Sequence, residues 1–184
     1  MRSANALVAD VLAELAAMVV PGVTTADLDA VAEKLVRAGG GEPAFKGYRG
    51  YPATLCASVN DQVVHGIPSP QTTLVEGDII SLDMGVKLNG FYGDSAVTVA
   101  VGRVSDDAAR LLRVTRESLE KAIEQVKVGV ASRISATPCS STSRRQASRS
   151  CASSSATGSG RRCTRSRRSR TTASPGAGRA WPRG

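Results

Sequence analysis

The segment from residue 79 to residue 99, IISLDMGVKLNGFYGDSAVTV, constrains the fold of this chain most strongly. Asn89 and Gly90 give a strong signal for a two-residue β-hairpin turn, because both residue types tolerate the positive φ of a type I′ turn. Closing the hairpin there pairs Leu88 with Phe91, Val86 with Gly93 and Asp83 with Ala96. The segment therefore predicts two long antiparallel strands.

This register places two aspartates on one face of the hairpin. Asp83 lies opposite Ala96 and Asp94 opposite Gly85, so the two carboxylates are diagonal neighbours with Cα atoms about 7–8 Å apart. Two like charges on an apolar strand pair are costly without a partner, and a divalent cation is a suitable one. The alternative is a pair of surface aspartates that flank a turn. The apolar flanks IISLD and SAVTVAV favour the metal site.

The charge of the chain is divided between two regions. Residues 1–130 contain 12 Lys and Arg and all 16 Asp and Glu, whereas residues 131–184 contain 12 Arg, no Lys and no acidic residue. The C-terminal region also contains 14 Ser, and its only large apolar side chains are Ile134 and Trp181. Such a segment cannot bury enough apolar surface to offset the entropy lost on ordering. We therefore expect one folded domain over residues 1–136 and a disordered tail over residues 137–184.

Two interpretations of this Arg/Ser-rich tail are open. An arginine-rich segment is typical of an arm that binds nucleic acid without sequence specificity. The alternative is GC-rich coding DNA read out of frame, since Lys, Asn, Asp and Glu are all missing from the tail. Codons chosen to encode residues 149–160 give a hydrophobic segment with a Gly-His-Gly loop when they are regrouped one base earlier. We favour a frame slip near Ala136 to Pro138.

The remaining segments predict an α+β domain. Residues 4–20 and 105–126 have the apolar spacing of helices. A second helix should lie between them, with Thr24 or Thr25 and Asp27 at its start and Gly39 to Gly41 after its end. Residues 54–59 alternate as a strand, Asn60 and Asp61 form a turn, and residues 62–65 resume as a short strand. We expect the apolar side chains of the third helix to face inward, namely Leu111, Leu112, Leu119, Ile123 and Val126.

The histidine and the cysteines complete the set of candidate residues. His65 is the only histidine of the chain and lies at the end of the predicted short strand, where a histidine is usually structural or exposed. The surrounding turns and the expected proximity of the aspartate hairpin favour a residue that contacts substrate. Cys56 is interpreted as a small core residue. The other three cysteines lie in the tail at a spacing that fits no zinc site.

Two motifs together resemble the bacterial-type (type I) methionine aminopeptidases, metallopeptidases of the pita-bread fold. They are GYRGYPATLCASVNDQVVHGIP and EGDIISLDMGVKLNGFYGDSAVTV, and the resemblance covers residues 1–136. It implies an α+β fold whose N-terminal half is present here, with an antiparallel sheet and covering helices. A proline-specific or creatine-processing relative on the same fold is a weaker alternative, given VNDQVVHGIP.

The resemblance also implies a set of roles. Asp83 and Asp94 would bind two divalent metal ions (Co, Mn, Fe or Zn), and His65 would contact the substrate. Residues 156–158 stand where the family has its metal-binding histidine, Thr164 stands near its second substrate histidine, and its two metal-binding glutamates lie further on. Only two of five metal ligands are then present, and we expect no activity from this chain.

The implied reaction is removal of the N-terminal methionine from nascent proteins or peptides by a monomeric metalloaminopeptidase. The alternative is a non-catalytic fragment whose basic tail binds nucleic acid. Because no signal peptide or apolar run near 20 residues is present, we expect a cytoplasmic protein that does not enter membranes. Half of such a fold should also leave one sheet edge and one apolar face uncovered.

Overall fold

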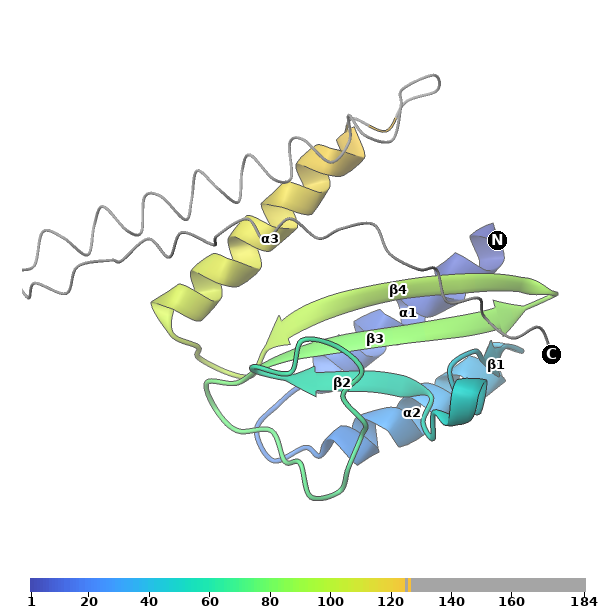
Figure 1. Cartoon of the computed structure of the whole chain (residues 1–184), viewed down its shortest axis with the longest axis horizontal. Helices are drawn as coiled ribbons and strands as arrows, with labels where there is room; N and C mark the ends of the chain where they lie inside the picture. Colours follow the sequence, from blue (N-terminus) through green and yellow to red (C-terminus); the bar gives the residue numbers. More distant parts are fainter. Residues whose placement is uncertain (125, 127–184) are drawn as a thin grey trace, which may run out of the picture. The chain divides into compact units, whose positions relative to one another are not determined.

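A computed structural model of the chain describes residues 1–124 and 126 (Figure 1). The predicted disorder of residues 137–184 lies outside these residues. The described part combines helices with one antiparallel sheet, which confirms the α+β expectation. No helix within it is long and apolar enough to cross a membrane. The elements in chain order are α1 (Arg2–Met18), α2 (Thr25–Ala38), β1 (Glu42–Pro43), the 3-10 turn η1 (Tyr48–Gly50), β2 (Leu55–Val59), β3 (Ile79–Leu88), β4 (Phe91–Ala100) and α3 (Asp106–Glu124).

The hairpin of β3 and β4 has the predicted turn and register. Asn89 and Gly90 have φ values of 52° and 78°, and Leu88 pairs with Phe91. The other edge of β3 pairs with β1 and with β2 (Figure 1). β3 therefore has strand neighbours on both sides, and it fixes the position of every other strand.

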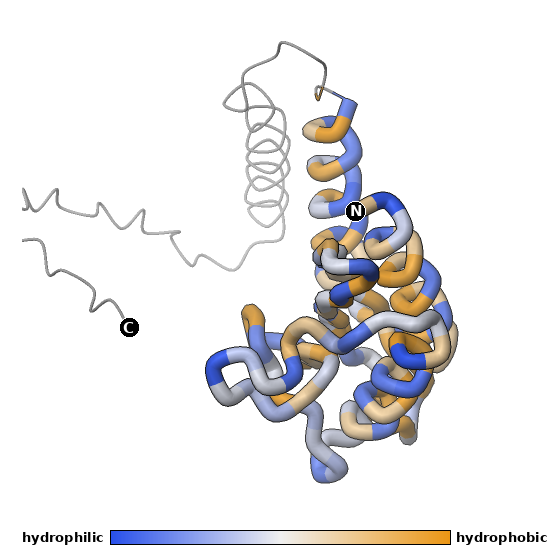
Figure 2. Tube along the Cα trace, turned by 90° about the vertical axis from the view of Figure 1, so that its right-hand side faces the viewer, coloured by the Kyte–Doolittle hydropathy of each residue, from blue (hydrophilic) through white to orange (hydrophobic). Residues whose placement is uncertain are grey.

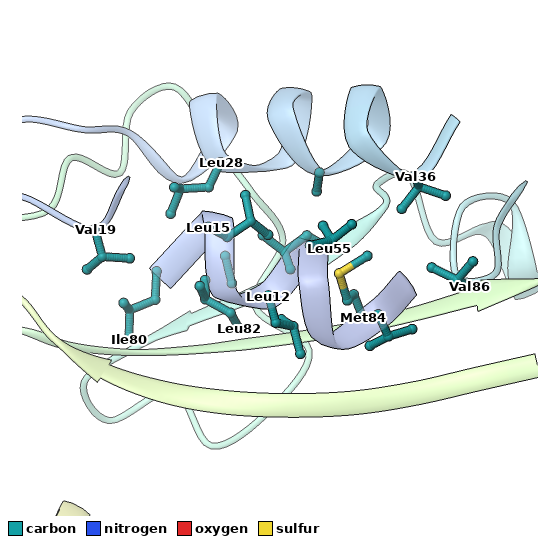
Figure 3. Close-up of a cluster of buried hydrophobic side chains, with 14 of the residues drawn as sticks. Leu12, Leu15, Val19, Leu28, Val36, Leu55, Ile80, Leu82, Met84 and Val86 are labelled. Carbon is teal, nitrogen blue, oxygen red and sulfur yellow. The ribbon is translucent and has the colours of Figure 1, made fainter. Parts of the chain in front are cut away.

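The helices α1 and α2 cover one face of this sheet, and the hydrophobic core lies between the helices and the sheet (Figure 3). Alternate residues of β3 face this core because successive side chains of a strand point to opposite faces. The predicted apolar row of α1 packs against them, and the colouring of Figure 2 shows hydrophobic and hydrophilic positions alternating along the helices. The fully buried β3 residues are Ile80, Leu82, Met84 and Val86.

The start of α2 is fixed by a reciprocal pair of hydrogen bonds. The Thr24 hydroxyl accepts from the Asp27 N–H at 3.1 Å, and the Asp27 carboxylate accepts from the Thr24 N–H at 3.0 Å. This arrangement is a capping box, which satisfies donors that the first turn of a helix leaves unpaired. The predicted cap at Thr24 is thus confirmed.

The prediction of a short strand over residues 62–65 is wrong. The turn at Asn60 and Asp61 is present, but Gln62 to His65 have no strand partner among the described residues. The Gln62 side chain accepts the hydrogen bond of the Val59 N–H at 3.1 Å, which closes the turn locally. The chain returns to β2 only at Gly66, whose carbonyl accepts from the Ala57 N–H.

The prediction that the apolar side chains of α3 face inward is also wrong. The helix forms, and it ends at Glu124 rather than Val126. Leu111, Leu119, Ile123 and Val126 are nevertheless more than half exposed, while Leu112 is partly buried. The apolar spacing correctly indicates a helix with a face to bury. It does not indicate whether the surface that buries this face belongs to the same part of the chain.

Candidate metal and substrate site

Asp83 and Asp94 lie on the face of the sheet opposite the helices. In β3 the neighbours of Asp83, Leu82 and Met84, are buried in the core, so Asp83 points to the other face. In β4 the α-carbon of Gly93 faces the backbone of α1, so the next residue, Asp94, also points away from the helices. Asp83 pairs with Ala96 and Asp94 with Gly85, as the sequence predicted. The two carboxylates are therefore diagonal neighbours on one surface.

The two carboxylates affect one another electrostatically. Partial burial raises the pKa of Asp83, the negative charge of Asp94 raises it further, and the imidazole of His65 partly offsets both effects. Because burial and a like charge both disfavour the ionised form, a bound cation would stabilise it. The surroundings of Asp83 thus favour either a proton or a metal ion.

Both aspartates and His65 line the same pocket, which has a volume of about 740 Å³. The structure therefore brings together all three residues that the sequence singled out. The other side of the pocket comes from the loop before β2 and from the segment after His65. Aromatic and apolar side chains form most of this wall, and the lining residues besides His65, Asp83 and Asp94 are Phe45, Tyr48, Arg49, Gly50, Tyr51, Pro52, Cys56 and Ile67.

His65 occupies an unusual backbone conformation. Its φ is 60°, a left-handed value that is uncommon for a residue with a side chain. The next residue, Gly66, lies so close to the Ala57 carbonyl and Ser58 that a Cβ at position 66 would overlap the backbone of β2. The Gly66 N–H also donates to the Ser58 hydroxyl at 3.0 Å. These contacts hold Gly66 against β2 and so fix the position of the preceding residue, His65, beside that strand.

Two residues that the sequence did not single out support the pocket. The Tyr51 hydroxyl lies 2.9 Å from the Leu55 carbonyl and 3.2 Å from the Gly66 carbonyl, so it joins β2 to the segment that carries His65. Asp29 of α2 accepts from the N–H groups of Thr54 and Leu55 at 2.9 and 2.8 Å. A tyrosine between Gly50 and Pro52 is a signal that could have pointed to the first contact. No local pattern points to the second.

Burial raises the pKa of the Cys56 thiol, and the nearby carboxylates of Asp83 and Asp94 raise it further, while a contact with the Tyr51 hydroxyl lowers it. A thiol in such surroundings stays protonated, and only the thiolate is a strong nucleophile or metal ligand. Cys56 is buried, as predicted, and it lies directly opposite Asp83 in the neighbouring strand. It therefore contributes to the wall of the pocket rather than to a reactive centre.

The donor chemistry of this pocket suits a divalent metal ion, but the number of donors does not. Carboxylate oxygens are good ligands for hard or borderline divalent ions. A catalytic zinc site, however, takes about three protein ligands. Within residues 1–124 and 126, no group of three or more His, Cys, Asp or Glu side chains could hold an ion. The described residues provide one side of such a site and do not complete it.

Known proteins have sequences similar to most of this chain. The methionine aminopeptidase of Clostridium acetobutylicum is 49% identical over 129 residues, which are 70% of this chain and 52% of that protein. Methionine aminopeptidase 1 of Mycobacterium tuberculosis is 46% identical over 70% of this chain and 48% of its own length. This chain thus spans about half the length of the curated relatives it matches.

Solved structures agree with the fold. The methionine aminopeptidase of Thermotoga maritima has a TM-score of 0.68 and 44% identity, covering 69% of this chain and 51% of that one. The methionine aminopeptidase of Rickettsia prowazekii has a TM-score of 0.75 and 33% identity, covering 79% and 58%. The prolidase of Pyrococcus furiosus, at 18% identity and a TM-score of 0.68, shares the fold. The expected N-terminal half of a pita-bread fold is confirmed.

The matched region of one family model has defined bounds, which include the first helix and the aspartate hairpin. The sequence model of metallopeptidase family M24 matches residues 1–140. This chain belongs to metallopeptidase family M24, and it resembles the N-terminal half of the bacterial methionine aminopeptidases.

Proposed function

We propose that this chain carries one side of a metal-dependent site that removes the N-terminal methionine from nascent proteins. Asp83 and Asp94 are the proposed metal ligands, and His65 is the proposed substrate contact. The observation that carries this proposal is the pair of carboxylates on one face of the β3–β4 hairpin, in a pocket shared with His65. Membership of a metallopeptidase family supports it further.

The lining of the pocket supports a substrate with an apolar first side chain. Phe45, Cys56 and Ile67 give the wall an apolar surface, and Arg49 supplies a positive charge. A ligand pocket typically combines such apolar surface with a few polar groups that fix orientation. A neutral His65 imidazole can donate a hydrogen bond to a peptide carbonyl or accept one from an amine. These side chains can bind and orient the end of a peptide.

We infer that the chain does not turn over substrate alone, because two carboxylates do not complete a metal site. The family indicates divalent metal cofactors, and two ions of Co, Mn, Fe or Zn are the proposal for this site. The cytoplasm is the proposed compartment, and a monomer is the proposed state of the isolated chain.

Calorimetric titration with Mn²⁺ tests the proposed ligands. The chain should bind the ion weakly, and either D83N or D94N should remove the binding. The matched control is D61N, which neutralises an exposed aspartate outside the pocket. A methionine-release assay with a Met-Ala peptide and Co²⁺ should give no product. Unchanged Mn²⁺ affinity in both pocket variants, or clear release of methionine, would contradict the proposal.

A second candidate function rests on the composition of residues 131–184. This region has 12 Arg and no acidic residue, which favours non-specific binding to nucleic acid by a fragment without catalytic activity. Such binding should weaken steeply as the salt concentration rises, and it should vanish when residues 131–184 are deleted.

The competing proposal is that residues 137–184 are translated out of frame. An uninterrupted single reading frame around Ala136 in the coding DNA would contradict it.

A further inference from the structure

Side-chain packing does little to hold His65 in the pocket. His65 is exposed, and the two residues before it, Val63 and Val64, are both more than half exposed. Its backbone nevertheless has a left-handed φ of 60°. A residue with a Cβ keeps such a conformation only where its surroundings fix it. The support for His65 must therefore act through the backbone next to it.

That support is found at Gly66, which is hydrogen-bonded through both of its peptide groups. The Gly66 N–H donates to the Ser58 hydroxyl at 3.0 Å. The Gly66 carbonyl accepts from the Ala57 N–H at 2.9 Å, and the Tyr51 hydroxyl lies 3.2 Å from the same carbonyl oxygen. The two peptide groups on either side of the Gly66 α-carbon are thus held separately.

Each of these peptide groups carries a different pocket residue. A peptide group is planar, and its plane contains the α-carbons on both sides. The Gly66 N–H lies in the plane that contains the α-carbon of His65, whereas the Gly66 carbonyl lies in the plane that contains the α-carbon of Ile67. His65 and Ile67 both line the pocket. The Ser58 hydroxyl therefore acts on the position of His65, and the groups bound to the carbonyl act on that of Ile67.

Ser58 itself lies beside the pocket and is not among the residues that line it. It is 4% exposed and belongs to β2, two residues after the pocket residue Cys56 and so on the same face of the sheet. A buried hydroxyl needs a hydrogen-bond partner, and the Gly66 N–H provides one. Ser58 is thus placed to affect the pocket through Gly66 and not through a contact with a bound molecule.

We propose that Ser58 is a positioning residue, whose hydroxyl sets the place of the His65 imidazole in the pocket through the Gly66 N–H. Without this hydrogen bond, the peptide plane between His65 and Gly66 turns, and His65 relaxes to a negative φ. Its imidazole then leaves the place it has in the pocket shared with Asp83. The consequence for peptide binding rests in addition on the substrate contact proposed above.

NMR of the full chain tests the conformational step. A residue with a positive φ has a short distance between its own amide and α protons, and so a strong intraresidue nuclear Overhauser effect. This effect at His65 should be strong in the unchanged chain and weak in S58A. The Gly66 amide should exchange with solvent about twofold to tenfold faster in S58A, as expected for the loss of one hydrogen bond. S58C keeps the size of the side chain but is a weaker acceptor, so it should show a smaller change.

The matched control is S81A. Ser81 pairs with Ser58 across β2 and β3 and lies on the same face of the sheet, and its hydroxyl is 2.9 Å from the Thr98 hydroxyl. S81A removes the same atom and one side-chain hydrogen bond. It should leave the His65 Overhauser effect and the exchange of the Gly66 amide unchanged.

Calorimetric titration with the tripeptide Met-Ala-Ser connects this position to binding. S58A and H65A should each weaken peptide binding by about twofold to tenfold, the change expected for the loss of one neutral hydrogen bond. The double variant should bind no more weakly than H65A, because Ser58 acts through His65 and the two effects do not add. S81A should bind the peptide as the unchanged chain does.

The outcomes separate this proposal from the proposed function. If S58A and S58C keep the strong His65 Overhauser effect, or S81A weakens it equally, Ser58 does not position His65. Additive effects of S58A and H65A on peptide affinity would likewise overturn the proposal. If S58A alone weakens the Overhauser effect while H65A leaves peptide affinity unchanged, the positioning role is supported and the proposed substrate contact of His65 is contradicted.

Discussion

Replacement of Asp29 by alanine tests whether the pocket wall depends on α2. Asp29 accepts from the N–H groups of Thr54 and Leu55, both of which are fully buried. Leu55 is the first residue of β2 and Thr54 directly precedes it, and the next residue, Cys56, pairs with Asp83 of β3. The Asp29 carboxylate therefore holds the strand that forms one wall of the pocket.

The magnitude follows from the two donors left unpaired. A buried donor without an acceptor costs about 1–3 kcal/mol, so two of them give a range of about 2–6 kcal/mol. Asp29 is only partly buried, and water can enter the space that D29A leaves. The lower part of the range, about 2–3 kcal/mol in the free energy of unfolding, is therefore expected. D29N keeps one acceptor oxygen and should cost less than about 1 kcal/mol.

Urea unfolding followed by circular dichroism measures both variants. Hydrogen exchange provides a local measurement, because the amides of Thr54 and Leu55 should exchange faster in D29A and near their original rates in D29N. Equal destabilisation by the two variants would show that the hydrogen bonds are not the cause. Unchanged exchange of both amides in D29A would refute the structural role assigned to Asp29.

Three further perturbations test the cap, the packing and the charges. T24A removes the capping box and should lower the free energy of unfolding, measured with urea, by about 1 kcal/mol. Hydrogen bonds from Thr24 lower the pKa of Asp27, so the difference in free energy of unfolding between T24A and the unchanged chain should shrink as the pH falls below 3.8. G93A places a Cβ about 2.6–2.8 Å from the backbone of α1, so it should cost about 1–3 kcal/mol, with S95A within about 0.5 kcal/mol as control. D94N should lower the pKa of Asp83 measured by NMR without restoring its usual value, because burial, the larger cause, remains.

The hairpin could be predicted from sequence because its signals are local. The Asn89-Gly90 turn sets the register, and period-two alternation then decides which face each residue occupies. That Asp83 and Asp94 share one face follows from those two facts alone. The cap of α2 is equally local, because Thr24 and Asp27 are three residues apart.

The remaining features depend on contacts that sequence spacing does not encode. Asp29 reaches Thr54 and Leu55 across 25 and 26 residues, and Tyr51 reaches the Gly66 carbonyl across 15. The segment after Asn60 has the composition of a strand, but the Gln62 side chain closes the turn instead. The apolar spacing of Leu111, Leu119 and Ile123 correctly predicts the helix α3, but these three side chains are exposed in the described part of the chain. In each of these cases, the sequence does not show which hydrogen-bond partner or packing surface the residue contacts in the folded chain.

Manganese-induced broadening of carboxyl resonances tests the central claim most directly. In the chain labelled with ¹³C at aspartate carboxyl groups, Asp83 and Asp94 should broaden together at the lowest Mn²⁺ concentrations, because both line one pocket. The exposed Asp61 and Asp106 should be unaffected at those concentrations. Broadening of only one pocket aspartate, or of all four to the same extent, would contradict a shared ion between β3 and β4.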